Sequence, residues 1–131
     1  MRPKAFSYAA ALERDGTVRA EEGTPVAFGE EWNPEHLVLA AVARCTLASL
    51  RYYARDTAVE ASASSHGSVT RRDDDGLYAF VDMEVSFDVE LEPEPEDVDA
   101  LLTRAERGCF VGNSLTAKPR YRWRVNGRDV R

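Results

Sequence analysis

One segment, residues 33–54, constrains the fold more than any other part of the chain. Asn33, Pro34 and Glu35 supply an N-cap, a proline for the first helical position and an early acidic residue, so a helix should begin here and run to about the end of the segment. Residues 37–43 are apolar around the whole helix, whereas a surface helix carries a polar stripe. The sequence therefore predicts a central helix that is buried on most sides.

The clearest strand lies at residues 81–92, where apolar residues alternate with polar or acidic ones. This period of two is typical of a half-buried antiparallel strand. Residues 6–13 and 17–20 flank Arg14-Asp15-Gly16 and are expected to form a hairpin. Further strands are expected at residues 25–28, 59–70 and 119–125.

A second helix should begin near Pro95 and end at Gly108, because acidic residues occupy its first turn and arginines its last. A short helical turn is expected at residues 113–117. In the last strand, Arg120, Arg122 and Arg124 share one face and should pair with acidic residues across the sheet. The order of strands and helices predicts one α+β domain over residues 1–131, with a mainly antiparallel sheet.

The central helix also bears on assembly. A single sheet covers one side of a helix that is apolar on nearly every side, so a second subunit is expected to cover the rest. We therefore predict an intertwined homodimer in which the two central helices pack against each other between two sheets.

Charge and hydropathy exclude two classes of partner. The formal net charge is -6 at pH 7, whereas nucleic-acid binding needs an excess of clustered Lys and Arg. No run of apolar residues is long enough to span a membrane, and no convincing signal-peptide cleavage site follows the N-terminal stretch. We expect a cytoplasmic protein without nucleic-acid or membrane partners.

The chain has two cysteines, Cys45 in the central helix and Cys109 directly after Gly108. Their spacing excludes a CxxC redox motif, and two histidines are too few to complete a zinc site. A buried cysteine is most often a small hydrophobic residue, but paired cysteines in a cytoplasmic protein can be redox-active. A reactive thiolate needs a nearby cation. Arg44 points about 100° away from Cys45 around the helix, so Arg14 is the better candidate.

Three segments resemble the OsmC/Ohr family of thiol peroxidases. Asn33-Pro34-Glu35-His36-Leu37, with Cys45 ten residues after the glutamate, is similar to the family's NPExL segment and its peroxidatic cysteine. The segment around Cys109, with Asn113 and Ser114 after it, is similar to the family's resolving-cysteine region. Arg14-Asp15-Gly16 resembles the hairpin that carries the activating arginine in the Ohr branch.

The resemblance implies a mechanism. The Cys45 thiolate would attack an organic hydroperoxide and become a sulfenic acid, which Cys109 would convert to a disulfide. An external dithiol, such as a lipoyl-bearing protein, would then reduce the disulfide, and no metal or cofactor is required. In the family picture a carboxylate orients the arginine. Because ten helical residues span about 15 Å, we expect Glu35 to reach the site of the other subunit.

Aromatic residues are candidates for a lining suited to organic peroxides, namely Phe28, Trp32 and Phe110. Two other functions remain open. A dimer of the same fold could bind small apolar molecules with both cysteines structural, or it could act as a redox sensor without turnover. Steady consumption of peroxide would distinguish an enzyme from both alternatives.

Overall fold

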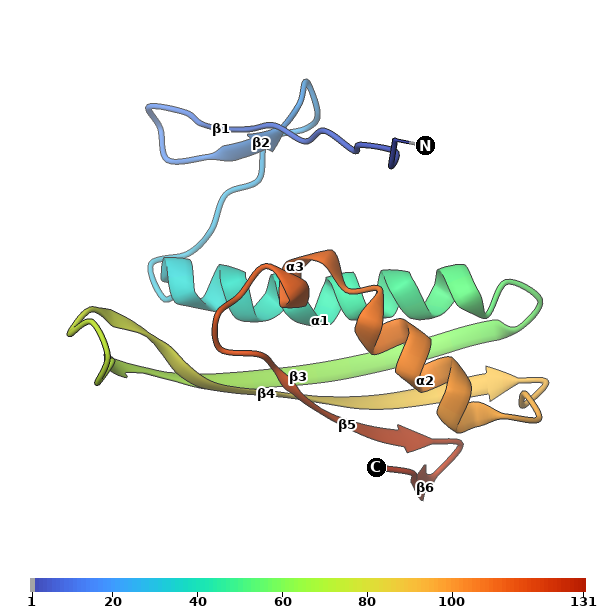
Figure 1. Cartoon of the computed structure of the whole chain (residues 1–131). Helices are drawn as coiled ribbons and strands as arrows, with labels where there is room; N and C mark the ends of the chain where they lie inside the picture. Colours follow the sequence, from blue (N-terminus) through green and yellow to red (C-terminus); the bar gives the residue numbers. More distant parts are fainter. Residues whose placement is uncertain (1) are drawn as a thin grey trace. The chain divides into compact units, whose positions relative to one another are not determined.

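The structure is a computed structural model that describes residues 2–131. It divides into two compact units, one ending at Pro34 and the other spanning Glu35–Arg131. The larger unit holds every helix and the main sheet of the described chain (Figure 1).

The N-terminal unit contains a short hairpin of β1 (Ala10–Leu12) and β2 (Val18–Ala20). In the turn between them Gly16 has a φ of +87°, which glycine adopts without strain. The carboxylate of Asp15 accepts hydrogen bonds from the Thr17 backbone N–H at 2.9 Å and from its hydroxyl at 2.7 Å. The predicted hairpin is therefore present, with strands shorter than expected. The expected strand at residues 25–28 is reduced to one bridge, between Val18 and Val26.

The main sheet has the strand order β3-β4-β5-β6. β3 (Ala58–Arg71) and β4 (Tyr78–Glu92) form a long antiparallel pair, as the alternation predicts. β5 (Arg120–Val125) is parallel to β4, because both smaller helices lie between them in the chain and allow a crossover. β6 (Arg128–Asp129) adds a short antiparallel edge that the sequence did not predict.

The helices are α1 (Pro34–Tyr53), α2 (Val98–Arg107) and α3 (Phe110–Asn113). α1 matches its prediction. α2 begins three residues later than expected, because the Asp97 side chain is its N-cap and accepts a hydrogen bond from the Ala100 N–H at 3.0 Å. The helical turn expected at residues 113–117 is wrong: it forms at α3, where the Cys109 sulfur takes the N-cap position.

α1 and α2 lie on the same face of the sheet (Figure 1). A row of buried side chains on β4, each at most 3% exposed, faces these helices. Leu50, Leu102 and Trp123 from the other elements complete the core. The row consists of Met83, Val85, Phe87, Val89 and Leu91. This arrangement confirms the α+β class and the mainly antiparallel sheet.

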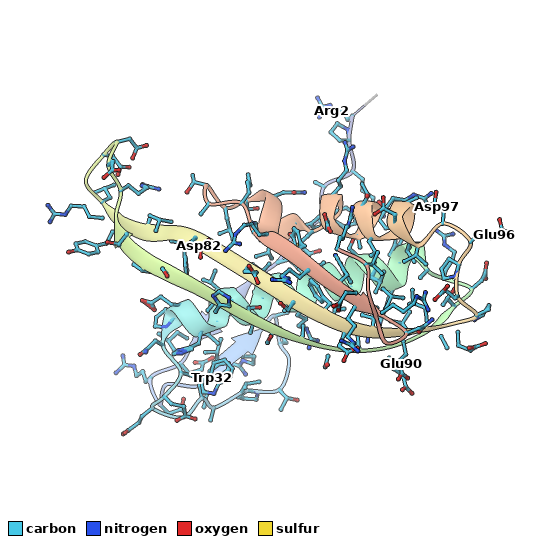
Figure 2. The ribbon with its side chains drawn as sticks, turned by 90° about the horizontal axis from the view of Figure 1, so that it is seen from below. Arg2, Trp32, Asp82, Glu90, Glu96 and Asp97 are labelled. Atoms are coloured by element: carbon cyan, nitrogen blue, oxygen red, sulfur yellow. The ribbon has the colours of Figure 1, made fainter. Side chains whose placement is uncertain are left out.

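The opposite face of the sheet is charged, and Figure 2 shows it with the Asp82 and Glu90 side chains labelled. Arg120 forms ion pairs of 2.8 Å with Asp82 and with Glu84, and Arg122 lies 3.9 Å from Glu84. The predicted pairing of the arginine row with acidic residues across the sheet is confirmed for these two arginines.

α1 is less covered than the sequence predicted for a central helix. Val42, Thr46, Ser49 and Leu50 on its sheet side are buried, but Ala40, Arg44 and Ala48 are exposed. The physical reason is that a sheet covers only one side of a helix. In one chain, the apolar residues on the other side of α1 remain at the surface.

Candidate active site

The two cysteines meet between α1 and α3. Cys45 is half-buried, and the Cys109 thiol lies close enough to it to raise the pKa of the Cys45 thiol. The backbone N–H groups of Val111 and Phe110 lie near the Cys45 sulfur and lower the same pKa. Both thiols are free. The structure thus brings together the two residues that the sequence singled out, which have 63 residues between them in the chain.

Cys109 is held from several sides. Its exposed fraction is 0%, and its sulfur accepts a hydrogen bond of 3.3 Å from the Gly112 N–H, which fixes the start of α3. The Cys109 S–H donates to the Val42 carbonyl of α1 at a distance of 3.8 Å. These contacts orient Cys109 toward the helix that carries Cys45.

Three further residues belong to this site and were missed by the sequence reasoning. The Tyr121 hydroxyl of β5 lies near the Cys109 thiol and the Thr46 hydroxyl of α1. Gly112 leaves room for them: a Cβ at this position would lie 2.7 Å from the Tyr121 hydroxyl and 3.3 Å from the Cys109 sulfur. The alternation in the last strand places Tyr121 on the face of the buried Trp123, but only the fold brings it to Cys109.

The electrostatics of Cys45 oppose its ionisation within the C-terminal unit. Burial raises the pKa of the Cys45 thiol above its ordinary value, and the neighbouring Cys109 raises it further. The Val111 and Phe110 N–H groups lower the same pKa, because they stabilise the thiolate, but burial is the largest effect. Cys45 therefore needs an additional positive charge to become a strong nucleophile.

The pKa of the Tyr121 phenol is also shifted. Burial raises the pKa of the Tyr121 phenol far above its usual range, and the nearby Cys109 and Glu106 add to this shift. Its phenol therefore keeps its proton throughout the neutral pH range.

The predicted assisting residues lie elsewhere. Glu35 is exposed in the first turn of α1, ten residues before Cys45 on one continuous helix, so about 15 Å separates them along the axis. Arg14 is exposed in the β1–β2 turn of the N-terminal unit, where the Gly16 N–H donates to the Glu13 carbonyl at 3.0 Å. The roles of Arg14 and Glu35 stay predictions.

The aromatic candidates fall in two places. Phe28 and Trp32 pack together in the N-terminal unit, with ring centroids 5.6 Å apart. Phe110 is 53% exposed at the start of α3, directly beside Cys109 in sequence. A lining role for these side chains stays a prediction.

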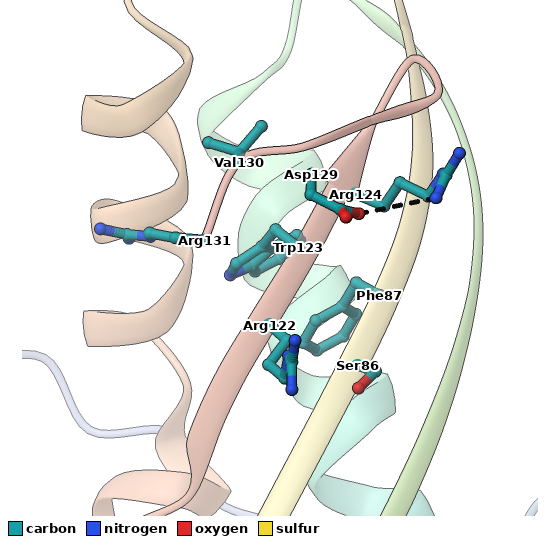
Figure 3. A pocket seen from close by; sticks show the side chains of 8 residues that line it. All are labelled: Ser86, Phe87, Arg122, Trp123, Arg124, Asp129, Val130 and Arg131. Atoms are coloured by element: carbon teal, nitrogen blue, oxygen red, sulfur yellow. Dashed lines mark ion pairs between the residues drawn. The ribbon is translucent and has the colours of Figure 1, made fainter.

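A separate pocket of about 430 Å³ lies at the β5–β6 edge of the sheet and includes neither cysteine (Figure 3). Its arginines pair with acidic side chains of the same chain. Arg124 lies 3.6 Å from Asp129, and Arg131 lies 3.0 Å from Glu106. Within residues 2–131, no cluster of three or more His, Cys, Asp and Glu side chains is placed to hold a metal ion. In the same residues, no helix combines the length and the apolar character that crossing a membrane requires.

Comparisons with known proteins point to one family. The family model described as OsmC-like protein matches residues 27–124. No match was found among curated proteins. An OsmC-like protein of unknown function from Vibrio cholerae has a similar structure, with a TM-score of 0.73 and 12% identity over 92% of this chain and 100% of that one.

Two more solved structures resemble the chain. An OsmC-like protein from Mycoplasma pneumoniae has a TM-score of 0.68 and 16% identity, covering 95% of this chain and 98% of that one. An organic hydroperoxide resistance protein OsmC from Legionella pneumophila has a TM-score of 0.60 and 19% identity, covering 94% and 98%. At these identities the similarity establishes a shared fold.

Proposed function

Because this chain belongs to the family of OsmC-like proteins, we propose that it is a cysteine-based peroxidase that reduces organic hydroperoxides to alcohols. One observation carries the proposal. A half-buried thiol and a fully buried thiol, from distant parts of the chain, lie close enough for Cys109 to raise the pKa of the Cys45 thiol, and Cys109 is hydrogen-bonded to the helix that carries Cys45. Such a pair can form a disulfide once Cys45 is oxidised.

The proposed cycle begins with attack of the Cys45 thiolate on the outer peroxide oxygen. The O–O bond breaks, Cys45 becomes a sulfenic acid, and the alkoxide takes up a proton and leaves as the alcohol. The Cys109 sulfur then attacks the Cys45 sulfur, which forms the disulfide and releases water. An external dithiol, for example a lipoyl-bearing protein, reduces the disulfide and is itself oxidised. No cofactor takes part.

Arg14 is proposed to supply the positive charge that Cys45 needs. Burial raises the pKa of the Cys45 thiol, and a guanidinium beside the sulfur would oppose that shift by favouring the charged form. Glu35 would orient this guanidinium across a subunit interface, because it is too far along α1 to serve Cys45 of its own chain.

The protein is therefore proposed to act as a homodimer. The exposed side of α1 supports this proposal, since Ala40 and Ala48 are small residues, one on either side of the exposed Arg44, next to which a second helix could pack. The two units are proposed to be parts of one domain. Sedimentation at micromolar concentration should give the mass of two chains, and a monomer under these conditions would contradict the proposed dimer.

Exposed aromatic rings are proposed to favour organic over hydrogen peroxide as the substrate. Phe110 exposes an apolar ring next to Cys109, and Phe28 and Trp32 offer two more in the N-terminal unit. Such rings would stabilise the alkyl group of a substrate. A cytoplasmic location fits this chemistry, because thiols remain reduced there.

A second candidate function rests on the raised pKa of the Cys45 thiol. A thiol that stays protonated at neutral pH reacts slowly. The protein could then bind small apolar molecules or sense oxidants without turnover.

The deciding experiment measures consumption of cumene hydroperoxide in the presence of excess dihydrolipoamide. The intact protein should turn over repeatedly, and Cys45→Ser should abolish consumption because it removes the attacking sulfur. Cys109→Ser should lose most steady turnover while its remaining thiol is still oxidised by peroxide. An intact protein that consumes no peroxide beyond the free dithiol rate would refute the enzyme.

A further inference from the structure

The Tyr121 hydroxyl lies at the sulfur of Cys109, although it takes no part in the cycle described above. A Cβ placed on Gly112 would approach the Tyr121 hydroxyl to 2.7 Å and the Cys109 sulfur to 3.3 Å, so both groups border the same point of the α3 backbone. The Cys109 thiol and the Thr46 hydroxyl are also near enough to the Tyr121 hydroxyl to shift its pKa. The phenol of β5 thus lies beside the Cys109 sulfur, close to both α1 and α3.

The Tyr121 phenol proton has two possible acceptors, the Thr46 hydroxyl oxygen and the Cys109 sulfur. The Thr46 hydroxyl donates its single proton to the Val42 carbonyl at 2.9 Å, so its oxygen is available to accept. When Cys109 is a thiol, its own S–H donates to the same carbonyl. When Cys109 is a thiolate, its charge makes it the stronger acceptor, and the Tyr121 proton should turn from Thr46 to the sulfur.

We propose that the Tyr121 hydroxyl and the Gly112 N–H stabilise the Cys109 thiolate that leaves when the Cys45–Cys109 disulfide is reduced. This inference rests on the proposed function and deepens it, because it assigns the order of events in the reductive half of the cycle. Cys109 is the leaving sulfur because it is fully buried, whereas Cys45 is half-buried and open to attack.

A thiolate of the external dithiol attacks the Cys45 sulfur, the S–S bond breaks, and its electron pair moves to Cys109. The second thiol of the dithiol then attacks the mixed disulfide and releases Cys45, which yields the oxidised dithiol. The two protons of the dithiol end on Cys45 and Cys109. A disulfide is reduced faster when its leaving thiolate is better stabilised.

Two features suit Tyr121 to this role. Burial keeps the pKa of its phenol far above neutral, so it remains a hydrogen-bond donor wherever the reductant is active. Its ring also stacks on Phe87, with centroids 6.3 Å apart, and this contact does not involve the hydroxyl. Tyr121→Phe therefore removes the donor and keeps the ring.

The test measures disulfide reduction apart from peroxidase activity. The full-length protein is oxidised with diamide to form the Cys45–Cys109 disulfide, and its reduction by dihydrolipoamide is followed by counting the released thiols. We expect Tyr121→Phe to be reduced about tenfold more slowly than the intact protein, the effect typical of losing a hydrogen bond to a charged group. The first oxidative step of the reduced variant, attack of Cys45 on one equivalent of cumene hydroperoxide, should keep its rate, because the donor that is removed lies at Cys109.

Tyr78→Phe is the matched control, because Tyr78 is 70% exposed on β4, and it should be reduced at the rate of the intact protein. Equal reduction rates for Tyr121→Phe and the intact protein would overturn the inference. So would a slowing of both half-reactions together with a lower unfolding temperature, which marks a structural role. Failure of diamide to link the two cysteines would overturn it as well. A protein that forms the disulfide with diamide but consumes no peroxide would instead refute the proposed function.

Discussion

The surroundings of Cys45 and of Cys109 differ sharply, although the two thiols are neighbours. Cys45 is half-buried on α1 and lies near the N–H groups of Phe110 and Val111. Cys109 has no exposed surface, and its sulfur is held by the Gly112 N–H and the Val42 carbonyl. One thiol is partly accessible, while the other is enclosed and oriented.

In the proposed cycle, this difference divides two tasks between the two thiols. Attack on a peroxide requires access and ionisation. Cys45 has the access, but burial raises the pKa of its thiol, so ionisation has to be supplied from another part of the protein. Resolution requires only that the second sulfur meets the first in the right place. Cys109 meets that requirement without access to solvent.

The largest expected difference between the two regions is in alkylation. In the reduced protein, iodoacetamide should modify Cys45 at least on the order of a hundredfold faster than Cys109, because a fully buried thiol reacts only after local opening. Peptide mass spectrometry after timed quenching measures the two rates in one sample. Under denaturing conditions the two thiols should react alike. Comparable alkylation rates of Cys45 and Cys109 in the folded protein would contradict the proposed division of roles.

A smaller effect is expected from filling the space around Cys109. Gly112→Ala would place a methyl group 2.7 Å from the Tyr121 hydroxyl, and overpacking of this kind lowers the free energy of unfolding by roughly 1–3 kcal/mol. Chemical denaturation measures the change.

Gly29→Ala is the control for this substitution. The new methyl group there would meet only the end of the flexible Glu31 side chain, which can move away. A Gly112→Ala protein as stable as the control would show that the surroundings of Cys109 are looser than the structure indicates.

The sequence predicted the fold better than the details of this site. The alternation in residues 81–92 and the helix start at Asn33-Pro34 each depend on neighbouring residues, and both elements formed where expected. The start of α2 was missed by three residues, because Asp97 competes with Pro95 for the role of first residue and its side chain caps the helix. Local patterns of this kind fix an element more firmly than its ends.

The site itself depends on contacts between distant segments. The sequence identified Cys45 and Cys109 by residue type and by resemblance, and the fold places them together. Tyr121 and Thr46 were missed because a tyrosine in a strand and a threonine in a helix look like ordinary core residues. They come near each other only once β5 lies parallel to β4 beneath the helix that carries Cys45.

The smallest effect concerns the charge proposed to act on Cys45. Below the pKa of a thiol, its thiolate fraction rises about tenfold per pH unit. Because the pKa of the Cys45 thiol is raised, the rate of its reaction with cumene hydroperoxide should increase as the pH rises above neutral. If Arg14 lowers that pKa, Arg14→Gln should shift the pH profile toward higher pH and slow the reaction at pH 7 by up to about tenfold. Stopped-flow measurements on reduced protein from pH 6 to 9 (roughly the span in which a thiol's thiolate fraction changes most) check this.

Arg19→Gln is the matched control, because Arg19 lies in the same hairpin and pairs with Glu13 at 2.5 Å. Superimposable profiles for Arg14→Gln and Arg19→Gln would assign the activation of Cys45 to a cation other than Arg14.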